Sequence, residues 1–230
     1  MKKIFITGAS RGIGEFLLKS FCSNNEYKVF GTYSSTEPTE LLNKYTKVDI
    51  TDNNAVYDWI NNNASAEDEI ILINCAGINY NALARKANIE QWKNVIDVNL
   101  VGIFNVISKV LPLMYEKKYG RIINLSSIVA QAGFMGTSAY AASKSALWGM
   151  TKSIALENAA HGITINNLNL GYMNVGMTIN DVPEKYHADI LKKIPCHEFG
   201  TPNNILNAIN YLIDSPYTNG SSIDINGGMY

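Results

Sequence analysis

The sequence has few cysteines and no long uninterrupted apolar run. Its three cysteines, Cys22, Cys75 and Cys196, are odd in number, widely spaced and without a CxxC pair, which argues against a disulfide framework and for a reducing compartment. The three histidines show no metal-ligand spacing with these cysteines, so we expect no metal. No run approaches the ~18 apolar residues of a membrane span, and the N-terminus lacks the apolar stretch of a signal peptide. We therefore expect a cytoplasmic protein.

The sequence also lacks a strong excess of either charge. The formal net charge is −1 at neutral pH, so nothing points to nucleic acid or to an anionic membrane surface as a partner. The hydrophobic fraction is 47% and the charged fraction 17%, which is typical of a globular protein. The 230 residues suit a single domain, residues 1–230, with one sizeable core.

Short apolar runs alternate with longer helical stretches along the whole chain. The pattern predicts strands at 4–6, 28–30, 45–48, 70–73, 121–125, 163–170 and 222–225, and helices at 12–24, 52–63, 89–117, 139–160 and 202–213. Thr201-Pro202 is a typical helix start and Gly162 a typical helix stop. We predict an α/β fold of the Rossmann type, a doubly wound parallel sheet of about seven strands with helices on both faces.

Two segments interrupt this alternation. Residues 34–44 are polar and contain Pro38, so this crossover is expected to be short and only partly helical. Residues 172–199 contain Pro183, Pro195 and scattered charge. They are interpreted either as a surface loop or as an active-site lid, because they follow the carboxyl end of a strand.

A glycine-rich turn follows the first predicted strand. Thr7 leads into Gly8-Ala9-Ser10-Arg11-Gly12-Ile13-Gly14, and a helix comes next. Glycines let the backbone approach a pyrophosphate closely, and a helix N-terminus offers free N–H groups and a positive dipole end. The G-x-x-x-G-x-G spacing differs from the standard fingerprint, and glycines also make purely structural bends. The position at the first strand–helix junction favours a dinucleotide site.

The choice between the two nicotinamide dinucleotides depends on the second strand. A carboxylate at its end would bind the ribose 2′-hydroxyl of NAD and repel a 2′-phosphate. Here Tyr33, Ser34 and Ser35 occupy that region, with no acid before Glu37. Arg11 can supply a cation, although an exposed loop arginine is the alternative interpretation, and Ser34 and Ser35 can donate hydrogen bonds. NADP(H) is therefore favoured over NAD(H).

Tyr140 and Lys144 share a helix face because Lys144 comes four positions after Tyr140. An ammonium beside a phenol favours the phenolate and lowers the pKa of the tyrosine, which makes it a usable acid or base. With 13 tyrosines and 19 basic residues, however, about one such spacing is expected by chance. Ser127 strengthens the hypothesis, because it lies 13 residues before Tyr140, at a strand's carboxyl end where open α/β sheets place their ligands.

Taken together, these motifs resemble those of the classical short-chain dehydrogenases/reductases over essentially the full length. The matching motifs are Thr7-Gly8-x-x-x-Gly12-Ile13-Gly14, Asp49, Asn74-x-Ala76-Gly77, Asn99, Ser127, Tyr140-x-x-x-Lys144 and Asn226-Gly227-Gly228.

The resemblance implies a role for each matching residue. Ser127 would orient the substrate oxygen, Tyr140 would transfer the proton, and Lys144 would bind the nicotinamide ribose and depress the tyrosine pKa. Asn99 would kink its helix and anchor a relay water. The implied cofactor-binding residues are Gly8, Ser10, Arg11, Gly12, Ile13, Gly14, Tyr33, Ser34, Asp49, Ile50, Asn74, Ala76, Gly77, Tyr140, Lys144, Gly171 and Met173. The resemblance also implies a homo-oligomer, a dimer or homotetramer, built on the helices near 100–117 and 139–160.

Within the family, the ending 224–230 and the segment 120–127 resemble 3-oxoacyl-[acyl-carrier-protein] reductases of fatty acid biosynthesis. This implies a β-keto thioester substrate and an acyl carrier protein partner. Three positions depart from that pattern: Leu170 precedes Gly171 where proline is usual, Val175 replaces a threonine near the nicotinamide carboxamide, and His161 joins Lys118 at the positively charged carrier-docking positions.

Two alternatives remain open at this point. Another small carbonyl, such as a sugar-derived or secondary-metabolite ketone, could be the substrate, in a pocket lined by residues 131–137 and 172–199. A catalytically idle dinucleotide-binding scaffold is the alternative of another class. Such proteins typically lack the active tyrosine or lysine, and this chain keeps both.

Overall fold

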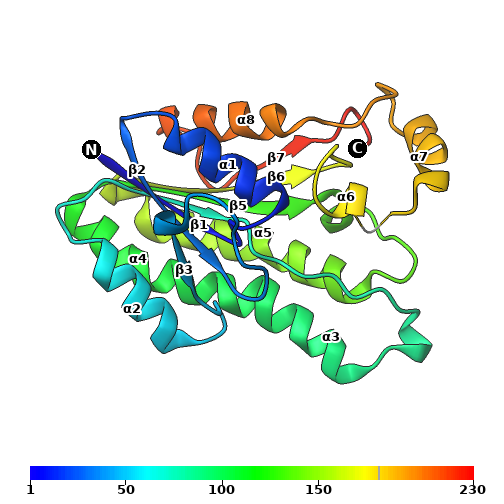
Figure 1. The fold of residues 1–230 in the computed structure, drawn as a ribbon, viewed down its shortest axis with the longest axis horizontal. Helices are drawn as coiled ribbons and strands as arrows, with labels where there is room; N and C mark the ends of the chain where they lie inside the picture. The colour runs from blue at the N-terminus through cyan, green and yellow to red at the C-terminus, as the bar shows by residue number, and fades with distance from the viewer. Residues whose placement is uncertain (181) are drawn as a thin grey trace.

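A seven-stranded parallel sheet forms the centre of the molecule in the computed structural model, which describes residues 1–180 and 182–230 (Figure 1). The strand order is β3-β2-β1-β4-β5-β6-β7. The strands are β1 (Lys2–Thr7), β2 (Tyr27–Tyr33), β3 (Tyr45–Lys47), β4 (Ile70–Asn74), β5 (Gly120–Ser127), β6 (Ile163–Leu170) and β7 (Ser222–Ile225). The order reverses between β1 and β4, so the carboxyl ends of these two strands flank the crevice that such folds use for ligands.

Helices cover both faces of the sheet. Figure 1 shows α1 (Gly12–Cys22) and α8 (Pro202–Asp214) above it, and α2 (Asn53–Asn63), α3 (Ile89–Ile96), α4 (Ile103–Lys117) and α5 (Ser138–Asn158) below it. Two shorter helices, α6 (Met177–Asn180) and α7 (His187–Lys193), follow β6. One apolar core lies on each face. The first is built around Phe5, Trp59 and Val106, and the second around Leu17 and Ile209.

The predicted fold class and all seven strands are confirmed. The prediction succeeded because the central strands are apolar on both faces. All five residues of β4 are buried, as expected for a parallel strand covered by helices. Residues at the helix ends set the helix boundaries. Asp52 caps α2 by accepting from the N–H groups of Asn54 and Ala55, and Thr201 begins α8. Gly162 has a φ of +69° where the segment after α5 ends.

One helix was predicted over 89–117, with a kink at Asn99 implied by the family resemblance. The structure divides it into α3, a π-helical turn η3 (Asp97–Gly102) and α4. The stretch from Ile89 to Lys117 is long and apolar enough to span a membrane by composition. Val106, Ile107 and Val110 of this stretch are nevertheless fully buried against the sheet, so it is a core helix of the fold.

A row of polar side chains crosses the buried sheet on the α5 side. Asn74, Asn124 and Asn167 lie in register on β4, β5 and β6, and Ser222 continues the row on β7. Asn74 Nδ2 donates to Asn124 Oδ1 (2.9 Å), Asn124 Nδ2 to Asn167 Oδ1 (3.2 Å), and Asn167 Nδ2 to Ser222 Oγ (3.0 Å). The row joins four strands across the buried sheet.

The 34–44 crossover is partly helical, as predicted, and so is the 172–199 segment, which was interpreted as a surface loop or a lid. The 34–44 crossover contains a single 3-10 turn, η1 (Leu42–Lys44). The 172–199 segment contains α6, a 3-10 turn η6 (Glu184–Tyr186) and α7; its Asp181 lies outside the described residues. A Cβ placed on Gly12 would lie 3.2 Å from Cα of Gly176. The segment after β6 therefore reaches the glycine turn.

Candidate active site

The glycine turn connects β1 to α1 through close backbone contacts. Gly8 has a φ of +63°, and a Cβ there would lie 2.7 Å from Cα of Ala76. A Cβ on Gly14 would collide with the carbonyl oxygen of Gly8. Side chains at either position would close the space between the turn and the segment after β4. This cradle, at the N-terminus of an eleven-residue helix, fits the pyrophosphate of a dinucleotide.

The segment after β4 is held against the same turn. Thr7 Oγ1 accepts hydrogen bonds from the N–H groups of Cys75 and Ala76, both at 3.1 Å. The N–H of Gly14 donates to the Cys75 thiol, and burial raises the pKa of that thiol to about 12. Cys75 is therefore a neutral packing residue of the turn rather than a thiolate. Asn74, at the end of β4, belongs to the buried asparagine row.

Tyr140 and Lys144 lie on α5, beside the carboxyl end of β5. The Tyr140 hydroxyl is hydrogen-bonded to the Ser127 side chain. Lys144 Nζ donates to the carbonyl oxygen of Leu125 at 2.7 Å and lies 5.6 Å from the centre of the Tyr140 ring. The structure therefore brings together all three residues that the sequence placed at this site.

The pKa of Tyr140 differs from the sequence-based expectation that Lys144 lowers it. Burial raises the pKa of Tyr140 to about 12, and the hydrogen bond with Ser127 opposes this only in part. The ammonium of Lys144 is directed to the Leu125 carbonyl instead. Burial lowers the pKa of Lys144 to about 8. Near neutral pH both groups are protonated, so Tyr140 is a proton donor in this state.

Asn99 is buried in the π-helical turn and fixed by three hydrogen bonds. Its Oδ1 accepts from the N–H of Ile78 (2.8 Å), and its Nδ2 donates to the Ile78 carbonyl (2.8 Å) and to Ser143 Oγ (3.1 Å). Ser143 Oγ in turn donates to the Tyr140 carbonyl (2.8 Å). A Cβ on Gly77 would lie 3.3 Å from Asn99 Oδ1 and 3.6 Å from Lys144 Nζ. Asn99, Gly77 and Lys144 are therefore neighbours.

Ser143 was missed by the sequence analysis. Its position three residues after Tyr140 places it on the same helix face, which was the available signal.

The residues predicted for the adenosine side lie at the ends of β2 and β3. Tyr33 ends β2 and is followed by the exposed Ser34, while Arg11 is exposed in the glycine turn. Asp49 Oδ1 accepts from the N–H and the hydroxyl of Thr51, at 2.9 and 2.8 Å. Ile50 is buried, and its carbonyl accepts from Asn105 Nδ2 (3.1 Å). One Asp49 oxygen is therefore occupied by the local turn.

On the other side of the site, Gly171 and Met173 follow β6. The backbone N–H of Met173 donates to Thr178 Oγ1 at 3.2 Å, and Val175 packs against the apolar core under α8. The hydroxyl beside Met173 is thus supplied by Thr178, not by the residue at position 175. Sequence reasoning missed Thr178 because it looked for the threonine only at position 175.

A hydrogen-bonded network beside the site involves residues with no local sequence signal. Trp148 Nε1 donates to Asn169 Oδ1 (3.1 Å), and Asn169 Nδ2 donates to Asp224 Oδ1 (2.8 Å). Gln131 Nε2 lies 2.9 Å from both carboxylate oxygens of Asp224. The network ties the segment after Ser127 to α5, β6 and β7.

The described residues contain no group of three or more His, Cys, Asp or Glu side chains that could hold a metal ion. The groups assembled at this edge of the sheet are instead a glycine cradle and a tyrosine–lysine–serine set, which suit a nicotinamide dinucleotide rather than a metal.

A sequence profile of the family described as short chain dehydrogenase matches residues 2–185. The match covers well over half of the chain, so the chain belongs to the short-chain dehydrogenase family and is an oxidoreductase that uses a nicotinamide cofactor.

Several individual members of the family are similar to this chain over its full length. The chain is 37% identical over 242 residues to the 3-oxoacyl-[acyl-carrier-protein] reductase FabG of Buchnera aphidicola subsp. Baizongia pistaciae, covering 100% of this chain and 98% of the relative. It is 32% identical to the FabG of Escherichia coli K12, covering 100% and 97%. The crystal structure of a 3-oxoacyl-[acyl-carrier protein] reductase from Brucella melitensis superposes with a TM-score of 0.90 at 27% identity, covering 100% and 91%.

Proposed function

We propose that residues 1–230 form one dinucleotide-binding and catalytic domain that reduces a carbonyl to an alcohol with NADPH, and that its substrate is a 3-oxoacyl thioester. The observation that carries this proposal is the cluster of Ser127, Tyr140 and Lys144 at the carboxyl edge of the sheet, linked to Asn99 through Ser143. The full-length similarity to 3-oxoacyl-[acyl-carrier-protein] reductases supports the substrate class.

The residues perform distinct parts of the proposed reaction. The bound cofactor supplies the hydride that the carbonyl carbon accepts. The Ser127 hydroxyl orients the carbonyl oxygen by a hydrogen bond, and the Tyr140 hydroxyl donates its proton to that oxygen, which becomes the alcohol. Lys144, protonated near neutral pH, holds the nicotinamide ribose and favours the phenolate that remains on Tyr140. Asn99 and Ser143 fix the backbone from which Tyr140 extends.

The position of the proposed carrier-docking residues bears on whether a carrier protein could reach the active site of the same copy. Lys118 and His161 immediately precede β5 and β6, so they lie near the amino ends of these strands, while Ser127 and Tyr140 lie at the carboxyl ends. An acidic carrier held by Lys118 and His161 would therefore face away from the active site of the same copy. We propose a cytoplasmic homo-oligomer in which such a carrier serves another copy.

A cofactor-oxidation assay tests this function. The nicotinamide absorbance is followed with NADPH and NADH, using an acetoacetyl thioester, a carrier-bound β-keto acyl chain and several simple ketones. We expect NADPH oxidation with the thioesters, and a loss of about 10²–10⁴-fold in kcat for Tyr140→Phe. Tyr57→Phe, on the exposed face of α2, is the matched control.

The other outcomes separate the parts of the proposal. Turnover of a simple ketone without the thioesters would keep the mechanism and overturn the substrate. Turnover that survives in Tyr140→Phe would overturn the role of Tyr140. Binding of NADPH without turnover of any substrate would favour the idle scaffold.

A further inference from the structure

The carboxyl end of β2 and the start of β3 are fastened to the glycine turn. The N–H of Ala9 donates to the Thr32 carbonyl (2.7 Å), and the N–H of Gly8 lies 3.3 Å from Thr32 Oγ1. The Tyr45 hydroxyl donates to the Ala9 carbonyl at 3.2 Å. Side chains that extend past these contacts therefore share one small surface beside the start of α1.

Lys47 is placed on that surface by the register of the strands. Gly31 pairs with Tyr45, and Tyr33 pairs with Lys47. In-register neighbours of a parallel pair point to the same side, and alternate residues of a strand share a face. A Cβ on Gly31 would touch both Leu18 of α1 and the Tyr45 ring, which puts Tyr45 on the α1 side. Lys47 consequently lies on the α1 side too, next to Tyr33.

Three acidic groups of this region have partners of their own. Asp49 accepts two hydrogen bonds from Thr51. Glu15 and Glu40 both pair with Lys19, at 2.8 and 2.9 Å. Lys47 is exposed, and across residues 1–180 and 182–230 neither Lys47 nor Arg11 forms an ion pair. Two uncommitted cations thus extend from the end of β3 and the start of α1.

We propose that Lys47 binds the 2′-phosphate of the adenosine ribose together with Arg11, and so determines the preference for NADP(H). The inference rests on the proposed function, in which the cofactor carries that phosphate. A phosphate monoester has a charge of about −1.5 to −2 near neutral pH, which one guanidinium cannot neutralise. The lysine contributes a flexible point charge, and the arginine a planar fork of donors.

The test uses two adenosine fragments that differ only in this phosphate. Dissociation constants for adenosine 2′,5′-bisphosphate and adenosine 5′-monophosphate are measured by calorimetry, with NADPH and NADH alongside. We expect Lys47→Met to weaken binding of the bisphosphate about tenfold, the size of one lost charge-assisted hydrogen bond, and to leave the monophosphate unchanged within about twofold. Lys47→Arg should retain the preference.

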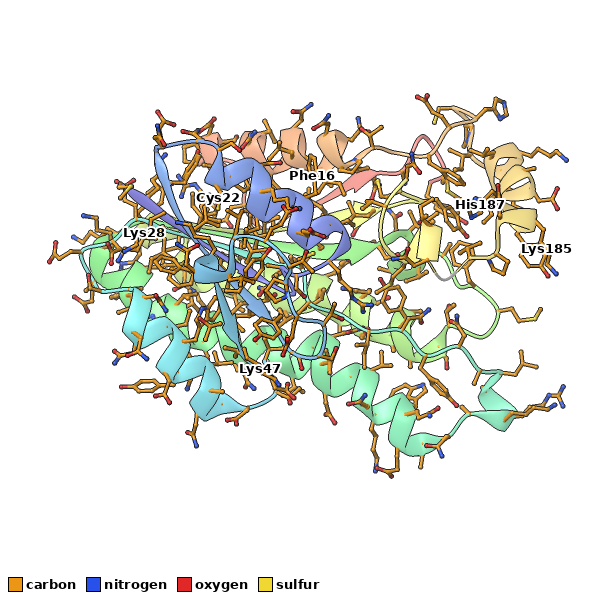
Figure 2. All side chains as sticks on the ribbon, viewed as in Figure 1. Phe16, Cys22, Lys28, Lys47, Lys185 and His187 are labelled. Carbon is orange, nitrogen blue, oxygen red and sulfur yellow. The ribbon has the colours of Figure 1, made fainter. Side chains whose placement is uncertain are left out.

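Lys28→Met is the matched control. Lys28 is also an exposed lysine of this half of the sheet, but it lies near the start of β2 with its ammonium 5.3 Å from the centre of the Phe30 ring. Figure 2 shows Lys28 and Lys47 at well-separated positions. We expect Lys28→Met to bind all four ligands as the parent protein does.

Three results would overturn the inference, and they differ in what else they affect. If the parent protein prefers the bisphosphate and Lys47→Met keeps that preference, Lys47 has no role, while the proposed cofactor stands. If Lys28→Met weakens binding of the bisphosphate as much as Lys47→Met does, the effect comes from the overall charge of the protein and not from a contact of Lys47. If the parent protein does not distinguish the two fragments, the proposed NADP(H) preference fails together with the role of Lys47.

Discussion

At the scale of single residues, the site keeps a charged amine where burial disfavours charge. Lys144 is only 4% exposed, and burial lowers its pKa from 10.5 to about 8. Its ammonium is compensated by one short hydrogen bond to the Leu125 carbonyl. Such a residue costs stability, as expected for the chemical role that we propose for Lys144.

Lys144→Met should therefore stabilise the protein. Each unit of pKa shift corresponds to about 1.4 kcal/mol, and the orphaned Leu125 carbonyl offsets part of the gain. We expect the free energy of unfolding to rise by about 1–3 kcal/mol near neutral pH, while reductase activity is lost. Denaturant unfolding measures the first effect.

The pH dependence of this difference has a definite sign. Between about pH 8 and 10.5 the unfolded chain binds the Lys144 proton more tightly than the folded protein does, so the parent protein gains stability as pH rises. The advantage of Lys144→Met should therefore shrink across that window. Lys152→Met, an exposed position on the same helix, should change stability by less than about 0.5 kcal/mol. A constant advantage at all pH values would contradict the explanation.

Ser143 connects Asn99 to the backbone of Tyr140. Ser143→Ala leaves the Asn99 amide with one unsatisfied buried donor, which costs about 1–3 kcal/mol in the free energy of unfolding. Ser153→Ala, at an exposed position of α5, is the comparison and should have almost no effect. Equal losses in the two variants, measured by denaturant unfolding, would show that the hydrogen bonds of Ser143 are not special.

At the scale of secondary-structure elements, local patterns and long-range contacts predict different things. Most strands were predictable because they are short apolar runs, and the start of α8 because Thr201-Pro202 is a typical helix start. The local pattern did not reveal the division of the 89–117 helix, which only the family resemblance implied through a kink at Asn99, because the division depends on hydrogen bonds between Asn99 and the distant Ile78. Likewise, the hydroxyl of Thr178 and the carboxylate of Asp224 became visible only once the strands were assembled.

The candidate site, too, was predictable where it depends on local sequence and not where it depends on long-range contacts. The resemblance identified Ser127, Tyr140 and Lys144 by their spacing, and the structure brings them together. The spacing of these residues in the sequence does not reveal that the Lys144 ammonium turns to the Leu125 carbonyl, because that orientation depends on the space left between β5 and α5. The spacing likewise does not reveal that burial raises the pKa of Tyr140.

The glycine turn predicts a sharp difference between two glycine substitutions. Gly8→Ala forces a side chain into a left-handed backbone conformation and against Ala76, so we expect a loss of about 1–3 kcal/mol and at least tenfold weaker NADPH binding. Gly133→Ala, where a Cβ meets nothing within 4 Å, should change neither quantity. Thermal unfolding and NADPH titration measure both. Unchanged NADPH affinity in Gly8→Ala would contradict the cradle.

The network around Asp224 should affect substrate binding more than chemistry. Asp224→Ala releases Gln131 and with it one end of the 131–137 segment. We expect KM for the carbonyl substrate to rise about three- to tenfold with kcat within about threefold. Steady-state kinetics provides the comparison, because partial unfolding would lower kcat and leave KM unchanged. A fall in kcat alone would exclude a positioning role.

At the scale of the whole molecule, α4 and α5 carry an apolar surface. Phe104 and Tyr115 are 49% and 45% exposed, and a shallow groove beside them is lined by Leu111, Pro112 and Ile154. These are the two helices on which the proposed homo-oligomer is built.

Phe104→Glu should dissociate that oligomer, because a carboxylate would be buried without a partner. Sedimentation velocity is expected to show a smaller species than for the parent protein. Tyr57→Glu on α2, where Tyr57 is 54% exposed, should leave the sedimentation coefficient unchanged. A parent protein that sediments as a monomer at micromolar concentration would overturn the proposed assembly.

The asparagine row across β4, β5, β6 and β7 has a consequence for how the chain reaches this fold. Apolar stretches such as Ile70–Ile73 and Ile122-Ile123 make nearly equivalent contacts when one strand slides past another, so burial of apolar surface alone discriminates poorly among alignments. A strand displaced by two residues would keep its apolar face inward. It would leave several amide side chains buried without hydrogen-bond partners, and each would cost about 1–3 kcal/mol of stability. The row therefore penalises misaligned sheets while they form, and it makes the correct pairing of four parallel strands distinguishable before the helices are fully packed.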